Sequence, residues 1–371
     1  MGGHRKTERP DLSNPYSPSP DSEDSDSQAK GTKTGRKWLG NLVKFAIPAG
    51  IIGFLLWNID QEQWDALSQS NKDYGVLAIA LVIAIVAMAL SFARWCILVR
   101  ALGIDLTMLE AQRLGSICFL LSFVSAGSVG GDVFKAIFLA RRRAGKRIEA
   151  VASVLVDRGA GLYGLLVLVT IALLFLDAPA DAQYMGKVTQ GTAALVGLGT
   201  VVLAILVFGG GIVDRLITWG STLPVLGGLV EKIGPPLRMF HNHKIAFGMS
   251  ILMSIGVQSL LVISIYFVAR GLYPQVAGGI QVPTLAEHFV IVPIGMLMSA
   301  LPLAPAGLGL LEAAIGKLYE VVPAVKTKAS GVLVALVFEI VKLVMGFIGT
   351  IFYWTANEEV RESLEEAEES E

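Results

Sequence analysis

Charge is scarce in this 371-residue sequence: charged residues make up only 16% of it, whereas hydrophobic residues make up 53%. A soluble globular chain carries roughly 25% charged residues, because its surface faces water. With a mean hydropathy of +0.62, this chain lacks the polar residues needed to cover a soluble fold of its size. The composition excludes an ordinary set of soluble domains. It also excludes a nucleic-acid-binding domain, which needs a basic face on a soluble body.

Cysteines and nucleotide-binding motifs are also scarce or missing. The two cysteines, Cys96 and Cys118, are too few for a disulfide framework. The sequence has no GxxxxGK[ST] motif for ATP phosphates and no GxSxG or HExxH motif for hydrolysis. His241 and His243 have the spacing of metal ligands, but no cysteine or carboxylate cluster accompanies them. We therefore predict no metal site, no cofactor and no enzyme activity.

Long apolar runs dominate what is present. A bilayer core of about 30 Å needs about 20 apolar residues in a helix. The runs predict an all-α, polytopic integral membrane protein with about six full spans: Leu39–Trp57, Tyr74–Val99, Val151–Leu176, Thr192–Val213, Phe247–Ala269 and Gly331–Trp354. Basic residues at 30–37 precede the first span. They favour a cytoplasmic N-terminus, and we expect the protein in the plasma (inner) membrane.

Two further apolar stretches are interrupted by glycine and proline. Residues 114–140 contain SAGSVGGD, and residues 286–322 contain PLAPAGLGLLE. Gly and Pro at this density break an intramembrane helix. Since basic residues flank both ends of the first stretch, we predict a re-entrant hairpin there; the alternative is one span with a glycine kink. The cluster that comes after it is expected to contact lipid headgroups and fix orientation: Arg141, Arg142, Arg143, Lys146 and Arg147.

The two broken stretches resemble each other. In each, an Ala-Gly pair precedes an acidic residue, and five positions separate Gly127 from Asp132 and Gly307 from Glu312. The order span–span–hairpin–span recurs at an offset of about 180 residues, and an odd number of intervening spans inverts the second copy. Chance similarity between two glycine-rich stretches is the alternative. We predict a disordered cytoplasmic tail at residues 1–37, followed by a first membrane repeat at 38–190 and a second at 191–356. An acidic tail at residues 357–371 ends the sequence.

Three segments carry a family resemblance: SAGSVGGDVFKAIFLARR from Ser125, SVLVDRGAGL from Ser153 and PLAPAGLGLLEAA from Pro302. Together they resemble the membrane region of lysylphosphatidylglycerol synthases, a module that also occurs as a free-standing flippase-like protein. The family's Gly-Gly-Asp motif corresponds to Gly130-Gly131-Asp132, and the basic residue that follows it corresponds to Lys135. The family's Asp-Arg pair corresponds to Asp157-Arg158, and its motif from Pro to Glu corresponds to Pro305–Glu312. Ala126 and Ala306 depart from the family pattern and affect loop geometry rather than charge. No aminoacyl-transferase domain is expected after the last span, so the resemblance implies the lipid-translocating part.

Ionisable residues inside the predicted membrane segments form the candidate site. Each costs on the order of 2.5–3.5 kcal/mol at the bilayer centre. We therefore expect seven of them to converge on one polar cavity: Asp132, Lys135, Asp157, Arg158, Glu312, Glu339 and Lys342. Asp157 and Arg158 diverge by about 100° on a helix, so each needs its own partner. The helix breaks would contribute backbone N–H groups that attract phosphate, near Gly127, Gly130, Gly131, Pro305, Gly307 and Gly309. The alternative role of each charge is a helix cap or a structural ion pair.

These features predict a translocator for an anionic or aminoacylated phospholipid, or for a polyprenol-linked lipid. Two alternatives stay open. One is an accessory subunit or enzyme of glycolipid or polyprenol-linked assembly, and the other is a small-solute secondary transporter. Membrane lipids are the expected partners. A separate lipid-modifying enzyme and a second copy of the chain are candidate partners, and nucleic acid is not.

Overall fold

The computed structural model describes residues 59–124, 130–142, 145–175, 182–208, 243–274, 281–300, 309–325 and 327–354, with a few single residues at 53–57 and 211–222. The chain divides into two compact units, Met1–Ala46 and Ile47–Glu371. The first unit lies outside the described residues, and all of the described helices belong to the second. The predicted tails 1–37 and 357–371 and most of the predicted span 39–57 also lie outside them.

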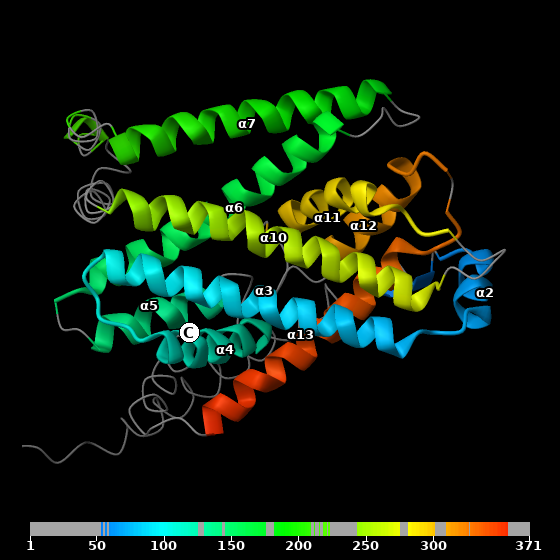
Figure 1. Cartoon of the computed structure of the whole chain (residues 1–371), viewed down its shortest axis with the longest axis horizontal. Helices are drawn as coiled ribbons and strands as arrows, with labels where there is room; N and C mark the ends of the chain where they lie inside the picture. Colours follow the sequence, from blue (N-terminus) through cyan, green and yellow to red (C-terminus); the bar gives the residue numbers. More distant parts are fainter. Residues whose placement is uncertain are drawn as a thin grey trace, which may run out of the picture. The chain divides into compact units, whose positions relative to one another are not determined.

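The described part is helical, and it contains no strand (Figure 1). The helices are α2 Gln61–Gln69, α3 Tyr74–Ala101, α4 Met108–Val124, α5 Gly130–Arg142, α6 Arg147–Phe175, α7 Ala182–Phe208, α10 Lys244–Leu272, α11 Leu285–Ser299, α12 Leu310–Val321 and α13 Gly331–Trp354. Four described helices, α3, α6, α10 and α13, are long and apolar enough to cross a membrane. The predicted all-helical, polytopic membrane fold is confirmed.

Helix α7 differs most from the expected spans. It begins at Ala182, whereas hydropathy placed the start of the span at Thr192, and its first turns carry the polar residues Gln183, Lys187 and Gln190. Hydropathy locates the apolar part of a helix, but backbone hydrogen bonding extends the helix through polar turns as well. Residues 192–208 of the predicted span therefore form the C-terminal part of a longer helix, and most of residues 209–213 lie outside the described residues.

Helices α3 and α10 pack closely along their length. Small residues permit this, since Ala80 and Ala84 of α3 are fully buried, as is Ser264 of α10. The Ser264 hydroxyl donates to the carbonyl oxygen of Ala80 across the interface at 2.8 Å. Small residues and interhelical hydrogen bonds of this kind join helices in membranes, where apolar burial provides little driving force.

Each glycine-rich break separates two short helices that pack against each other. Helices α4 and α5 flank residues 125–129, and α11 and α12 flank residues 301–308. A Cβ added at Gly131 of α5 would overlap the carbonyl oxygen of Cys118 in α4, and one added at Gly295 of α11 would lie 2.9 Å from Ile315 in α12. A straight span with a kink would carry the second helix away from the first. Both broken stretches are therefore hairpins.

The contacts between helices pair off across the two halves. When α3, α4, α5 and α6 are matched in order to α10, α11, α12 and α13, each contact within the first half has its counterpart in the second. The contacts between halves also match: α6 with α11 corresponds to α13 with α4, and α6 with α10 corresponds to α13 with α3. The α3–α10 contact maps onto itself. This is the contact pattern of two copies related by a two-fold axis, the form that an inverted repeat predicts.

The two halves of the chain also share a helix cap at matching positions. Thr107 precedes α4 and Thr284 precedes α11, and each is followed three residues later by a glutamate. In both, the threonine N–H and hydroxyl donate to the glutamate carboxylate, while the glutamate N–H donates to the threonine Oγ1 at 3.2 Å. Such a capping box satisfies backbone donors at a helix start. Its recurrence shows that both hairpins begin in the same way.

Candidate functional site

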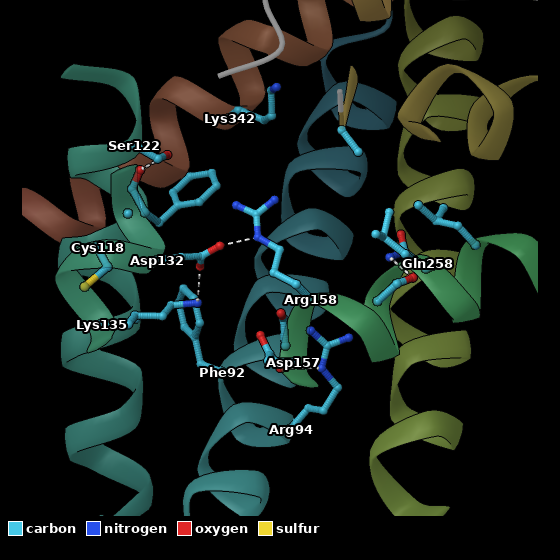
Figure 2. A pocket seen from close by; sticks show the side chains of 18 of the residues that line it. Phe92, Arg94, Cys118, Ser122, Asp132, Lys135, Asp157, Arg158, Gln258 and Lys342 are labelled. Carbon is cyan, nitrogen blue, oxygen red and sulfur yellow. Dashed lines mark hydrogen bonds and ion pairs between the residues drawn. The ribbon is translucent and has the colours of Figure 1, made fainter. Parts of the chain in front are cut away.

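A cavity of about 370 Å³ lies among helices α3, α4, α5, α6, α10 and α13 (Figure 2). The described residues that line it include four basic and two acidic side chains: Arg94, Lys135, Arg158, Lys342, Asp132 and Asp157. Ser91, Ser122 and Gln258 add polar groups, and Phe92 and Leu165 are among its apolar residues. Charged groups from four different helices therefore face one space.

Asp132 forms the centre of the charge network in this cavity. It lies in the first turn of α5 and is 9% exposed. The Arg158 Nε donates to one of its carboxylate oxygens, and the Lys135 Nζ lies 3.5 Å from the other (Figure 2). Lys135 also lies 5.3 Å from the centroid of the Trp95 ring, a cation–π distance. Burial of a carboxylate is tolerable only when it is paired in this way.

A second ion pair joins three helices beside the first. Arg94 of α3 is 5% exposed, and its Nε donates to the Asp157 Oδ1 of α6 at 2.9 Å. Its Nη1 donates to the hydroxyl of Ser254 in α10 at 2.8 Å. Asp157 therefore pairs with Arg94, while its neighbour Arg158 pairs with Asp132, as the divergence of adjacent helical residues predicts. The hydrogen bond from Arg94 to Ser254 connects the first half of the chain to the second.

The expected convergence of seven ionisable residues does not extend to Glu312 and Glu339. Neither is among the described residues that line the cavity. Glu312 is fully buried at the start of α12, and its Oε2 accepts the N–H of Gly309 at 2.7 Å. Glu339 lies next to the cavity, with its Oε1 2.6 Å from the Nζ of Lys342. Glu312 thus caps its own helix because its side chain reaches back to the preceding turn.

The helix breaks are described only at their edges. Gly127, Pro305 and Gly307 lie outside the described residues. Helix α5 begins at Gly130, and α12 begins at Leu310. Gly309 has a φ of 87°, in the left-handed region where a side chain is strained. Glycine at this position lets the chain turn into α12.

The basic cluster after α5 divides into separate roles. The Lys146 Nζ donates to the carbonyl oxygens of Leu102 and Gly103, at 3.3 and 3.2 Å, and so caps the C-terminal end of α3. Arg141 and Arg147 are exposed, whereas Arg143 and the side chain of Arg142 lie outside what is described. Headgroup contact by this cluster stays a prediction.

Sequence reasoning did not place Arg94 or Gln258 in the site. The signal that identifies both is a polar side chain deep inside a long apolar run, because such residues in membrane helices face the protein interior. The Gln258 Nε2 lies 3.4 Å from the carbonyl oxygen of Gly161, and its Oε1 is buried without a hydrogen-bond partner among the described residues.

The match to a known protein family covers most of the chain. A family model described as the lysylphosphatidylglycerol synthase TM region matches residues 41–349. The match includes both hairpins and nearly all of the four span-length helices. A comparison with curated proteins gave no match. This integral membrane protein therefore belongs to the family of the lysylphosphatidylglycerol synthase transmembrane region.

Proposed function

We propose that this protein moves an anionic lipid between the leaflets of the membrane, with the lipid phosphate in the cavity and the acyl chains in the bilayer. The observation that carries the proposal is the charge of the cavity, where four basic side chains meet two acidic ones among the described residues. Even with Glu339 counted as the partner of Lys342, these described charges leave a net positive charge, and positive charge in a low-dielectric environment attracts phosphate. It disfavours a cationic solute for the same reason.

The edge of the cavity supports a lipid over a small solute. The Arg158 side chain is 42% exposed, whereas that of its partner Asp132 is 12% exposed. Leu162, one turn further along α6, also lines the cavity and is 40% exposed. Leu155 continues this apolar face one turn in the other direction. A headgroup held at Arg158 can therefore leave its acyl chains against the apolar face of α6.

Exchange of partners provides the binding step. Arg158 and Lys135 both pair with Asp132. A buried ion pair contributes little net stability, because desolvation offsets most of the attraction. A lipid phosphate supplies several charge-assisted acceptors to the same two side chains, so it can replace Asp132 as their partner. Rocking of one half of the chain against the other would then expose the cavity to the opposite leaflet.

The shared phosphate chemistry covers the candidate substrates: an anionic phospholipid, its aminoacylated derivative and a polyprenol-linked phosphate. In this proposal the protein is a transporter and not an enzyme. A separate lipid-modifying enzyme would supply or use the lipid. The protein would lie in the plasma membrane with its N-terminus in the cytoplasm.

Liposomes test the proposal directly. We would reconstitute the purified protein with fluorescent phosphatidylglycerol and follow dye in the outer leaflet with a membrane-impermeant quencher. Lys135→Gln should slow transfer by about tenfold or more, since it removes a charge-assisted contact worth about 1.5–3 kcal/mol. The matched control is Lys317→Gln, because Lys317 is exposed on α12 and its ion pair is with Glu320. If the wild-type protein moves no lipid with or without a pH gradient, or if both variants behave alike, the proposal fails.

A further inference from the structure

Two buried carboxylates lie on the adjoining helices α12 and α13. Glu312 is fully buried and Glu339 is 7% exposed. Their helices pack against each other, with Gly316 of α12 against Val332 of α13, and the charges of Glu339 and Lys342 act on Glu312. When ionised, the three side chains together carry two negative charges and one positive charge. Glu312 and Glu339 form what we call the carboxylate pair.

The hydrogen bonds leave this group incomplete. The Glu312 Oε2 accepts the Gly309 N–H at 2.7 Å, and the Glu339 Oε1 contacts the Lys342 ammonium at 2.6 Å. The Glu312 Oε1 and both oxygens of Glu339 are buried without a hydrogen-bond partner among the described residues, so Lys342 acts on Glu339 only as an ion pair. A buried charge without a partner costs several kcal/mol. With both carboxylates ionised, one unit of negative charge is therefore left uncompensated among the described residues.

Other charged groups on the surrounding helices do not supply the missing charge. Helix α12 packs on α11 and α13, and α13 also packs on α3, α4 and α10. Most of the titratable side chains on these helices have partners elsewhere: Arg94 with Asp157, Arg100 with Leu106, Glu110 with Thr107, Arg270 with Tyr266, Glu287 with Thr284, His288 with Tyr319 and Lys317 with Glu320. Arg113 and Lys244 are exposed near the starts of α4 and α10.

The corresponding residue of the first repeat shows what is different here. Asp132 occupies the position that matches Glu312, and it has two basic partners. Glu312 has a backbone N–H and a second carboxylate in the place of those partners. The two repeats have thus diverged: the charges around Asp132 are net positive, and those around Glu312 are net negative when all are ionised.

We propose that Glu312 and Glu339 together bind one proton, and that Lys342 links this proton to the phosphate site. A single proton neutralises the group, because two carboxylates that lie close together share a proton in preference to both being charged. The proton adds an O–H donor on one unpartnered carboxyl oxygen, directed toward the other carboxylate.

Lys342 connects the two sites because it contacts Glu339 and also lines the cavity. An anionic headgroup in the cavity attracts the Lys342 ammonium. The ammonium then neutralises less of the negative charge of Glu339. The carboxylate pair then takes up a proton from the solvent. This linkage rests on the proposed function, whereas the proton site itself does not.

Infrared difference spectroscopy on the purified full-length protein in detergent, without lipid, tests the proton site. A pH titration should show a carboxylic acid C=O band that is lost in Glu312→Gln and in Glu339→Gln. Gln keeps an acceptor for the Gly309 N–H, so the helix cap survives the substitution. Glu320→Gln is the matched control, since Glu320 is exposed on the same helix, and it should leave the band unchanged.

Three outcomes overturn the proton site. The first is a wild-type protein with no such band, and the second is a band that survives in both folded variants. The third is a band that responds to sodium chloride at fixed pH, which would make the ligand a sodium ion.

The linkage is tested separately. Addition of phosphatidylglycerol in mixed detergent micelles, at a constant pH just above the midpoint of the infrared titration, should cause net proton uptake of up to one proton per chain, measured with an indicator dye, and Lys342→Gln should abolish it. If the infrared band is present but lipid causes no uptake, the linkage is wrong and the proton site stands. If lipid does not cross liposomes while the band is present, the proposed function fails and the proton site again stands.

Discussion

Replacement of Arg94 by Met tests whether the buried ion pair holds α3, α6 and α10 together. Met fills similar volume but carries no charge. The variant leaves Asp157, which is 6% exposed, without its partner at 2.9 Å. Removing one partner of a buried ion pair costs about 3–5 kcal/mol. The hydrogen bond to Ser254 adds little, since interhelical hydrogen bonds in membrane proteins average about 0.6 kcal/mol and reach about 1.7. Arg94→Met should therefore destabilise the protein several times more than Ser254→Ala.

Unfolding of the purified protein by SDS in mixed micelles gives the measurement. Tryptophan fluorescence is a suitable probe, because the adjacent Trp95 is fully buried. The double variant Arg94→Met with Asp157→Leu should recover most of the loss, since it leaves no unpaired charge in the interior. The reasoning is refuted if Arg94→Met costs no more than Ser254→Ala, or if the losses of the two single variants simply add in the double variant.

Two further predictions concern the first hairpin. Gly131→Ala should lower the free energy of unfolding by about 1–3 kcal/mol, because its Cβ would overlap the carbonyl oxygen of Cys118. Gly161→Ala, where the nearest atom lies at 3.6 Å, should have little effect in the same SDS titration; equal losses would contradict the close packing. Asp105→Cys and Arg147→Cys, at exposed positions before and after the hairpin, should both react with an impermeant maleimide from the cytoplasmic side. Labelling from opposite sides would show that the chain crosses the membrane between them.

Hydropathy was sufficient for the long helices. The bilayer requires about 20 apolar residues and full backbone hydrogen bonding, so α3, α6, α10 and α13 follow from the sequence with small changes at their ends. The glycine-rich motifs marked both hairpins, because glycine allows the close approach seen between Gly131 and Cys118. The start of α7 did not follow, since helix ends depend on backbone hydrogen bonds that hydropathy does not register.

The charged site was predicted in part. Asp132 and Arg158 were recognised as membrane charges that need partners, and the structure pairs them with each other. Arg94 was not recognised as a site residue, because its partners Asp157 and Ser254 lie on helices distant in the sequence. Glu312 was expected in the cavity, but its own helix start uses its carboxylate as a cap.

The sequence by itself determined that this chain is a helical membrane protein, where its long helices lie, and that its two halves resemble each other, because these properties depend on local composition and spacing. Only the tertiary structure decided which charges meet. Pairing depends on the packing of helices distant along the chain, as for Arg94 and Asp157, which are 63 residues apart. That packing brought basic side chains of four helices to one cavity, and among the described residues it left the two buried carboxylates of the second half without full compensation.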